Sequence, residues 1–138
     1  MAEALILDSE ALNALAFASE RAVLAKRASA ILRLAHDKRA LVRVPSAVLA
    51  QVCRGVRYDS AINHLLNNPG IRVAELTRVA AQQAGHLLAK LKLSSAHAVD
   101  AFVVATALQF DTAVIATGDP RDIRRLAAPF RRIAIFAL

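Results

Sequence analysis

Residues 4–16 read ALILDSEALNALA, and this stretch sets the pattern that the rest of the chain follows. Its first four residues are an apolar run of strand length, which ends at Asp8. Ser9 and the residues after it read as the start of a helix, with Ser9 or Asp8 available as the N-terminal cap. The stretch therefore predicts a buried strand that passes directly into a helix, with a carboxylate at the junction.

The same alternation of short apolar runs and longer amphipathic stretches continues to the C-terminus. Further strands are expected at 41–44, 71–76, 112–117 and 131–138, and further helices at 20–37, after Pro45, at 57–67, 77–91 and about 95–109, and from Pro120 to about Ala127. Five strands alternating with helices indicate an α/β fold, in which a parallel sheet carries helices on both faces. The length predicts a single domain over residues 1–138.

Composition narrows the possible partners and the compartment. A net charge of +7 and a pI near 10.8 favour a polyanionic or acidic protein partner, although an alanine- and arginine-rich composition can also reflect genome bias. Cys53 is the only cysteine, which excludes an internal disulfide and a CxxC zinc site. No apolar run approaches the ~20 residues that span a bilayer, and the N-terminus does not resemble a secretory signal. We expect a cytoplasmic protein with no membrane partner.

Three aspartates lie next to or within apolar segments, where a charged side chain is unusual. Asp8 and Asp119 each follow an apolar strand, and Asp100 lies inside the otherwise apolar helical run AHAVDAFVVATAL. Each has a simpler alternative reading: Asp8 as a helix cap, Asp119 as a turn residue in TGDP, and Asp100 as one half of a buried ion pair with an arginine. Capping and turn formation do not apply to a residue in mid-helix, so Asp100 is the hardest to dismiss.

Together the three aspartates predict a cluster of carboxylates at the carboxyl edge of the sheet, where the strand ends of an open α/β sheet form sites. Such a cluster is costly without a cation, and hard oxygen ligands select Mg²⁺ or Mn²⁺. A carboxylate-bound metal in a basic protein fits phosphodiester cleavage, because the ion activates water and offsets charge on the phosphate oxygens.

Four segments, taken in order, resemble the PIN-domain ribonucleases, and specifically the VapC-type toxins of type II toxin–antitoxin systems. The segments are LILDSEALNAL (5–15), VPSAVLAQVCRG (44–55), AVDAFVVATAL (98–108) and AVIATGDPRDIRRL (113–126). The resemblance implies a three-layer α/β/α fold with a five-stranded parallel sheet, usually as a homodimer, and a metal-dependent endoribonuclease inhibited by a cognate antitoxin whose tail occupies the active-site groove. It also implies a metal site of Asp8, Asp100 and Asp119, with Asp122 as a further acid, unless Asp122 only complements a helix dipole.

The chain departs from this family pattern at position 51. The family normally has glutamate there, in a pattern like VLAE, whereas this sequence reads VLAQ and has Gln51. The amide nearly keeps the shape but removes a negative charge and any proton-accepting role, so a weaker metal site and slower cleavage are expected. The change is either natural or introduced to make a toxic nuclease tolerable, and both explanations stay open.

Several other residues are candidates for supporting roles. Ser9 and Thr117 flank the predicted site, and His97 precedes Asp100 by one helical turn and would share its face. Some arginines in or near the motifs would bracket an RNA backbone, unless they form a solvated basic face: Arg54, Arg57, Arg121, Arg124, Arg125, Arg131 and Arg132.

Two rival functions belong to other classes of protein. The first is a non-catalytic PIN-like subunit that binds RNA or protein, which the neutral Gln51 makes credible. The second is a phosphoacceptor domain that uses Asp8. This second reading lacks support, because Asp8 is followed by Ser9 and Glu10 and neither an adjacent acid pair nor a DxD pattern is present.

Overall fold

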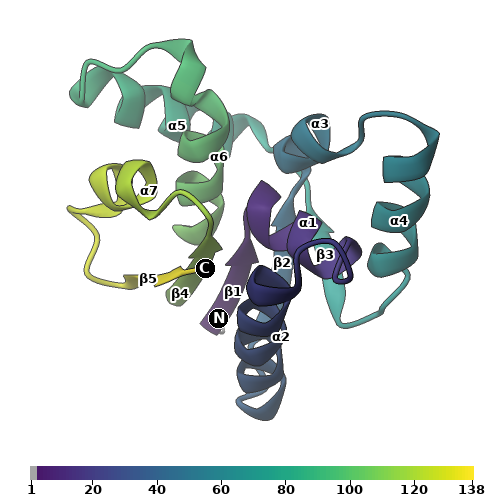
Figure 1. The fold of residues 1–138 in the computed structure, drawn as a ribbon. Helices are drawn as coiled ribbons and strands as arrows, with labels where there is room; N and C mark the ends of the chain where they lie inside the picture. Colours follow the sequence, from purple (N-terminus) through teal and green to yellow (C-terminus); the bar gives the residue numbers. More distant parts are fainter. Residues whose placement is uncertain (1–2) are drawn as a thin grey trace.

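A five-stranded parallel sheet in the order β3-β2-β1-β4-β5 forms the centre of the protein (Figure 1). The computed structural model describes residues 3–138, so the first two residues of the predicted domain lie outside the described residues. The strands are β1 Glu3–Leu7, β2 Leu41–Pro45, β3 Ile71–Ala74, β4 Thr112–Thr117 and β5 Ile133–Ala137. All five strands were predicted, and their parallel pairing confirms the α/β assignment.

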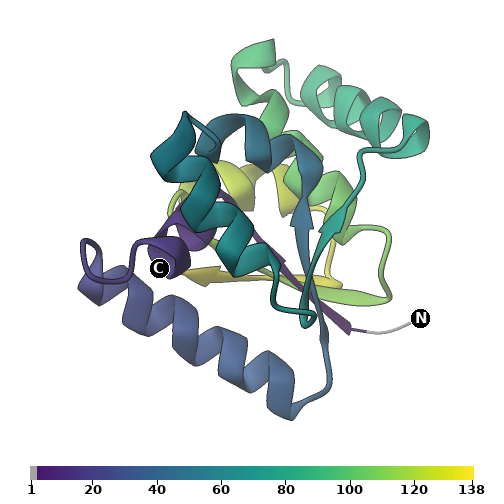
Figure 2. The ribbon, with the colours of Figure 1, turned by 90° about the vertical axis from the view of Figure 1, so that its right-hand side faces the viewer.

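Helices cover both faces of the sheet, as Figures 1 and 2 show from two sides. Because crossovers between parallel strands are right-handed, connections that run from β1 toward β3 lie on one face, and those that run toward β5 lie on the other. The first face carries α1 Ser9–Ala16, α2 Ala22–Asp37 and α4 Val56–Leu66, and the second carries α5 Arg78–Lys90, α6 Ala98–Ala107 and α7 Pro120–Ala127. The expected three-layer α/β/α arrangement is therefore confirmed.

The core is built around β1, the central strand. Ile6 and Leu7 are fully buried, and Ile115 on the neighbouring β4 is paired in register with Ile6. A strand covered by helices on both faces has no solvent side, which is why residues 4–7 are continuously apolar rather than alternating. This packing fixes the position of Asp8, the first residue after β1.

Two predicted elements, the helix after Pro45 and the strand 71–76, differ from the structure. The helix expected after Pro45 is a 3₁₀ turn, η1 Ser46–Val48, followed by the four-residue α3 Leu49–Val52. It ends before Gly55, whose φ of 115° is incompatible with a continuing helix. The expected strand 71–76 also ends early, at Ala74, and the backbone N–H of Leu76 donates to the Ser46 hydroxyl instead of a strand ladder.

The helix expected at about 95–109 begins later than predicted, and this corrects the position of Asp100. Ser94 caps a short 3₁₀ helix, η2 Ser95–His97, by accepting a hydrogen bond from the backbone N–H of Ala96, and α6 starts only at Ala98. Asp100 therefore lies in the first turn of α6 and not in mid-helix as predicted. A carboxylate in a first turn interacts favourably with the helix dipole, so part of the cost assumed for this residue is removed.

None of the helices within residues 3–138 is long and apolar enough to cross a membrane.

Candidate metal centre

The candidate centre lies where the strand order reverses. From the central β1, the chain moves through β2 to β3 on one side and through β4 to β5 on the other. In open α/β sheets, ligands bind in the crevice outside the carboxyl ends of the two strands at such a point. Asp8 directly follows β1, and the turn at Gly118 and Asp119 directly follows β4. The sheet topology thus brings together two of the predicted acidic positions, which are 111 residues apart in the chain.

Asp8 is held rigidly and is only 5% exposed. Its Oδ1 accepts a hydrogen bond from the N–H of Ala11 at 2.9 Å, so Asp8 caps α1, and its Oδ2 accepts one from the N–H of Gly118 at 3.2 Å. Burial raises the pKa of Asp8 above its usual value, while hydrogen bonds from Thr117, Ala11 and Gly118 oppose that rise. Asp8 is thus the helix cap of the simpler reading, and its carboxylate also ties α1 to the turn after β4.

Thr117 links Asp8 to Asp119. The fully buried Thr117 side chain hydrogen-bonds Asp8, and its Oγ1 accepts a hydrogen bond from the backbone N–H of Asp119 at 2.9 Å. Asp119 is itself exposed and precedes α7, and its side chain makes no capping hydrogen bond. The Asp119 carboxylate is therefore not used as a cap.

Among these acids, Asp100 has the pKa that is raised most. Burial raises the pKa of Asp100 to about 6, and repulsion from Asp119, Asp122 and Asp8 adds to the rise, while His97 opposes it. Among the ion pairs within residues 3–138, none joins Asp100 to an arginine, so the alternative of a buried Asp–Arg pair is not supported. The predicted acids therefore share one electrostatic environment, in which a cation would lower the repulsion.

Three side chains from three elements come within the span of a single ion. One ligand atom each from His97 in η2, Asp100 in α6 and Asp122 in α7 all lie within 4.8 Å of one another, and each residue is half-buried. Asp122 lies in the first turn of α7, as its helix-dipole alternative requires. The predicted set of Asp8, Asp100, Asp119 and Asp122 is therefore not one tight group in this structure. Asp100 and Asp122 form a group with His97, and Asp8 and Asp119 lie outside it.

The donor set fits a small hard cation. Carboxylate oxygens are the protein ligands that Mg²⁺ and Mn²⁺ prefer, and the cluster concentrates negative charge in a protein with a net charge of +7. Asp100 and Asp122 would hold such an ion directly. Asp8 and Asp119 contribute negative charge close enough to raise the pKa of Asp100.

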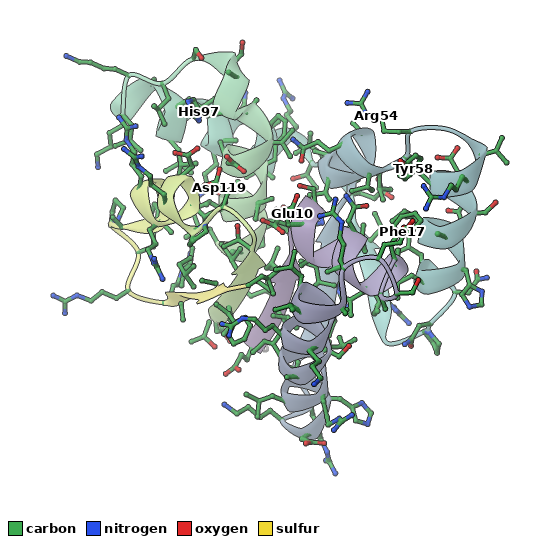
Figure 3. All side chains as sticks on the ribbon, in the orientation of Figure 1. Glu10, Phe17, Arg54, Tyr58, His97 and Asp119 are labelled. Atoms are coloured by element: carbon green, nitrogen blue, oxygen red, sulfur yellow. The ribbon has the colours of Figure 1, made fainter. Side chains whose placement is uncertain are left out.

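Glu10 is a neighbour that was not singled out in the sequence. It packs so closely against Gly118 that a Cβ atom placed on Gly118 would lie 2.5 Å from the Glu10 Cβ, and its carboxylate pairs with Arg21 at 3.0 Å. Figure 3 shows Glu10 at the edge of α1, facing the side of the molecule that carries Asp119. No motif marks this residue, because its proximity depends on how the turn between β4 and α7 packs against the first turn of α1.

Gln51 lies on the same edge but is exposed. It is part of α3, which packs against α1, while the preceding η1 contacts α6. Gln51 does not belong to the group formed by His97, Asp100 and Asp122.

The candidate arginines are dispersed. Arg121, Arg124 and Arg125 lie on α7 and are exposed, and Arg54 is exposed in the link between α3 and α4. Arg57 is engaged elsewhere, because it pairs with Glu20 and stacks over the rings of Phe17 and Tyr58. Arg131 and Arg132 precede β5 and therefore lie at the amino edge of the parallel sheet, opposite the acids. These two are wrongly placed to bracket a substrate at the acidic edge.

Fold and site together define a class of protein: an open α/β protein with an acidic centre at the switch point of a parallel sheet. Within that class, the chain belongs to the PIN-domain family, whose model matches residues 5–129. PIN-domain proteins are nucleases.

A solved structure has the same fold over almost the whole chain. It is the crystal structure of VapBC2 from Rickettsia felis bound to a DNA fragment from their promoter, with a TM-score of 0.67, 12% sequence identity and 98% of each chain covered. At this identity the likeness shows the fold alone. A search of curated proteins found no match.

Proposed function

We propose that this protein is a metal-dependent endoribonuclease of the VapC toxin type, held inactive by a cognate antitoxin. The single observation that carries this proposal is the acidic centre at the switch point of a PIN-domain sheet, with Asp8, Asp100, Asp119 and Asp122 on three separate connections. The antitoxin is supported by the resemblance of the four motif segments to VapC-type toxins and by the shared fold with a VapBC2 structure.

Each residue of the centre has a separate role in the proposed phosphodiester hydrolysis. A Mg²⁺ or Mn²⁺ ion held by Asp100 and Asp122, near Asp8 and Asp119, would supply an activated water and offset charge on the scissile phosphate. Thr117 and the Gly118 N–H fix the orientation of Asp8. The exposed Arg121, at the start of α7, would contact the RNA backbone beside the acids.

Gln51 is proposed to slow the reaction. Its neutral amide stands on α3, at the edge where the family has a carboxylate, so it adds no negative charge to the centre. Cleavage by the Gln51→Glu variant should therefore be faster than cleavage by the parent chain, by roughly a hundredfold or more if the group acts as a proton acceptor.

The test is a cleavage assay on total RNA with Mg²⁺, Mn²⁺ or EDTA. The parent chain, Gln51→Glu and Asp100→Asn are compared, with Gln82→Glu on α5 as the control, because Gln82 is an exposed glutamine away from the acids. Metal-dependent cleavage that is faster in Gln51→Glu, absent in Asp100→Asn and unchanged in Gln82→Glu supports the proposal. Equal rates for the parent chain and Gln51→Glu would contradict the role of position 51.

The second candidate function is a non-catalytic PIN-like subunit that binds RNA or protein. The observation that favours it is the exposed, uncharged Gln51. It predicts RNA binding with no cleavage in any metal, for the parent chain and for Gln51→Glu alike. Cleavage that disappears in Asp8→Asn and Asp100→Asn would rule it out.

The assembly and location are also proposals. A homodimer is expected from the VapC resemblance, and light scattering of the purified chain would measure it. A cytoplasmic location stays a prediction from the sequence, which cell fractionation would check.

A further inference from the structure

The group formed by His97, Asp100 and Asp122 contains one ligand that the family motif does not supply. His97 ends η2, Asp100 lies in the first turn of α6, and Asp122 lies in the first turn of α7, so three elements converge on one point. Figure 3 shows His97 on the same side of the molecule as Asp119, where α6 and α7 meet. An imidazole nitrogen is a softer ligand than a carboxylate oxygen, and its presence changes which ion the site prefers.

The spacing fits one ion. At metal–ligand distances of about 2.1 Å, neighbouring ligand atoms of an octahedral ion lie about 3 Å apart and opposite ones about 4.2 Å apart. The His97 Nδ1 lies 3.8 Å from the Asp122 Oδ2, and the whole group lies within 4.8 Å. Closing around an ion therefore requires movements of only a few tenths of an ångström to about one ångström, which half-buried side chains can make by small rotations.

The three side chains are not committed to other partners. Within residues 3–138, none of them takes part in a hydrogen bond to protein, and the distance of 3.8 Å between His97 and Asp122 is too long for one. The side chains of His97 and Asp122 are 30% and 31% exposed, so solvent and ions can reach them. Their free donor atoms are therefore available to a ligand.

We propose that His97 is a nitrogen ligand of the ion held by Asp100 and Asp122, and that it makes this centre prefer Mn²⁺ over Mg²⁺. The inference rests on the proposed metal centre. Mg²⁺ strongly favours oxygen ligands and keeps its water, whereas first-row transition ions accept imidazole readily. Two carboxylates with one imidazole thus suit Mn²⁺, which accepts both kinds of ligand.

The test measures metal binding directly and does not depend on RNA cleavage. Titration calorimetry gives the affinities of the full chain for Mn²⁺ and Mg²⁺, and pulsed electron paramagnetic resonance of the Mn²⁺ complex detects coupling to an imidazole nitrogen. The variant is His97→Gln, which offers an amide oxygen in place of the nitrogen. The control is His64→Gln on α4, because His64 is exposed and on the opposite face of the sheet.

In the parent chain and in His64→Gln, we expect nitrogen coupling and a clear preference for Mn²⁺. In His97→Gln the coupling should disappear and the Mn²⁺ affinity should fall roughly ten- to hundredfold, the range seen even for residues that only orient ligands, while the Mg²⁺ affinity changes little. Thermal melting without metal would establish that the variant is folded. Asp100→Asn should lose Mn²⁺ binding as well.

Three results would overturn the inference: no nitrogen coupling in the parent chain, the same ratio of Mn²⁺ to Mg²⁺ affinity in the parent and His97→Gln, or no Mn²⁺ binding. The outcome is separable from that of the proposed function. Nitrogen coupling without RNA cleavage leaves the inference standing and removes the nuclease. RNA cleavage with equal use of both metals and no nitrogen coupling does the reverse.

Discussion

Asp100 is the single residue whose chemistry should be most visible in the metal-free protein. Its pKa is raised to about 6 from the usual 3.8, so between about pH 4 and pH 6 the folded protein holds a proton that the unfolded chain has released. The free energy of unfolding therefore falls as the pH rises through this window. Asp100→Asn removes this loss, because the amide carries no charge at any pH.

At pH 7 in EDTA, Asp100→Asn should be more stable than the parent chain by about 1 kcal/mol, or roughly 3–5 °C in Tm, after allowance for solvent screening. Thermal melts from pH 4 to pH 8 would measure both proteins. Glu75→Gln, an exposed change in the link after β3, is the control and should keep the parent's pH profile. If the Tm of the parent chain does not fall between pH 4 and pH 6, the pKa of Asp100 is not raised as described.

The residues of the site differ in how far the sequence could reveal them. Asp8 and Asp119 were predictable because strand ends are visible as the ends of apolar runs. The first-turn position of Asp100 was missed, since Ser94 and η2 delay the start of α6 and nothing in the apolar periodicity marks that delay. Glu10 was missed because its contact with Gly118 depends on how the turn after β4 packs against α1 in the folded protein. Sequence therefore located the acids along the chain but not their grouping.

At the scale of elements, long periodic segments were predicted well and short ones poorly. The expected helix 20–37 is α2 Ala22–Asp37, and the strand 112–117 matches β4. The prediction of one helix after Pro45 was wrong in detail, because a 3₁₀ turn and a four-residue helix contain too few residues for a periodic signal. This segment is also the one that carries Gln51, so the least predictable element holds the departure from the family.

The contact between the β4–α7 turn and α1 should be intolerant of any side chain at position 118. A Cβ there would lie 2.5 Å from the Glu10 Cβ, a distance that requires the two elements to separate. Because the Gly118 N–H also donates to Asp8, Gly118→Ala should disturb the centre as well as the packing. We expect a loss of about 1–3 kcal/mol in stability, measured by denaturant unfolding, and weaker metal binding.

Gly85→Ala is the matched control for that change. Gly85 lies within α5, and a Cβ placed there has no atom within 4 Å. Alanine in a helix interior is favoured over glycine by about 0.5–1 kcal/mol, so this variant should gain stability and bind metal as the parent does. If Gly118→Ala were as stable as Gly85→Ala, the close contact with α1 would not exist in solution.

At the scale of the whole molecule, charge is divided between the acidic centre and a basic remainder. The chain has a net charge of +7, although four of its aspartates, Asp8, Asp100, Asp119 and Asp122, lie at the carboxyl edge of the sheet. A polyanion is attracted to the molecule as a whole and repelled locally by the carboxylates unless a cation is bound. Salt should therefore weaken RNA contacts over the whole surface, whereas a bound metal ion should strengthen only the contacts at the acidic edge.

This division predicts that arginines at the two edges of the sheet make unequal contributions to RNA binding. Arg121 is exposed next to Asp122 at the carboxyl edge, whereas Arg131 is exposed at the amino edge before β5. If RNA lies across the acidic edge, Arg121→Gln should reduce the slope of log affinity against log salt by about 0.7, the value for one phosphate contact with a single strand. Arg131→Gln carries the same loss of charge and should leave the slope unchanged. Fluorescence anisotropy with a labelled RNA whose modified backbone resists cleavage, in Mn²⁺ from 50 to 300 mM salt, would measure the slopes. Equal reductions for both arginines would mean that the net charge attracts RNA without orienting it. The acidic edge would then not be the RNA-binding face.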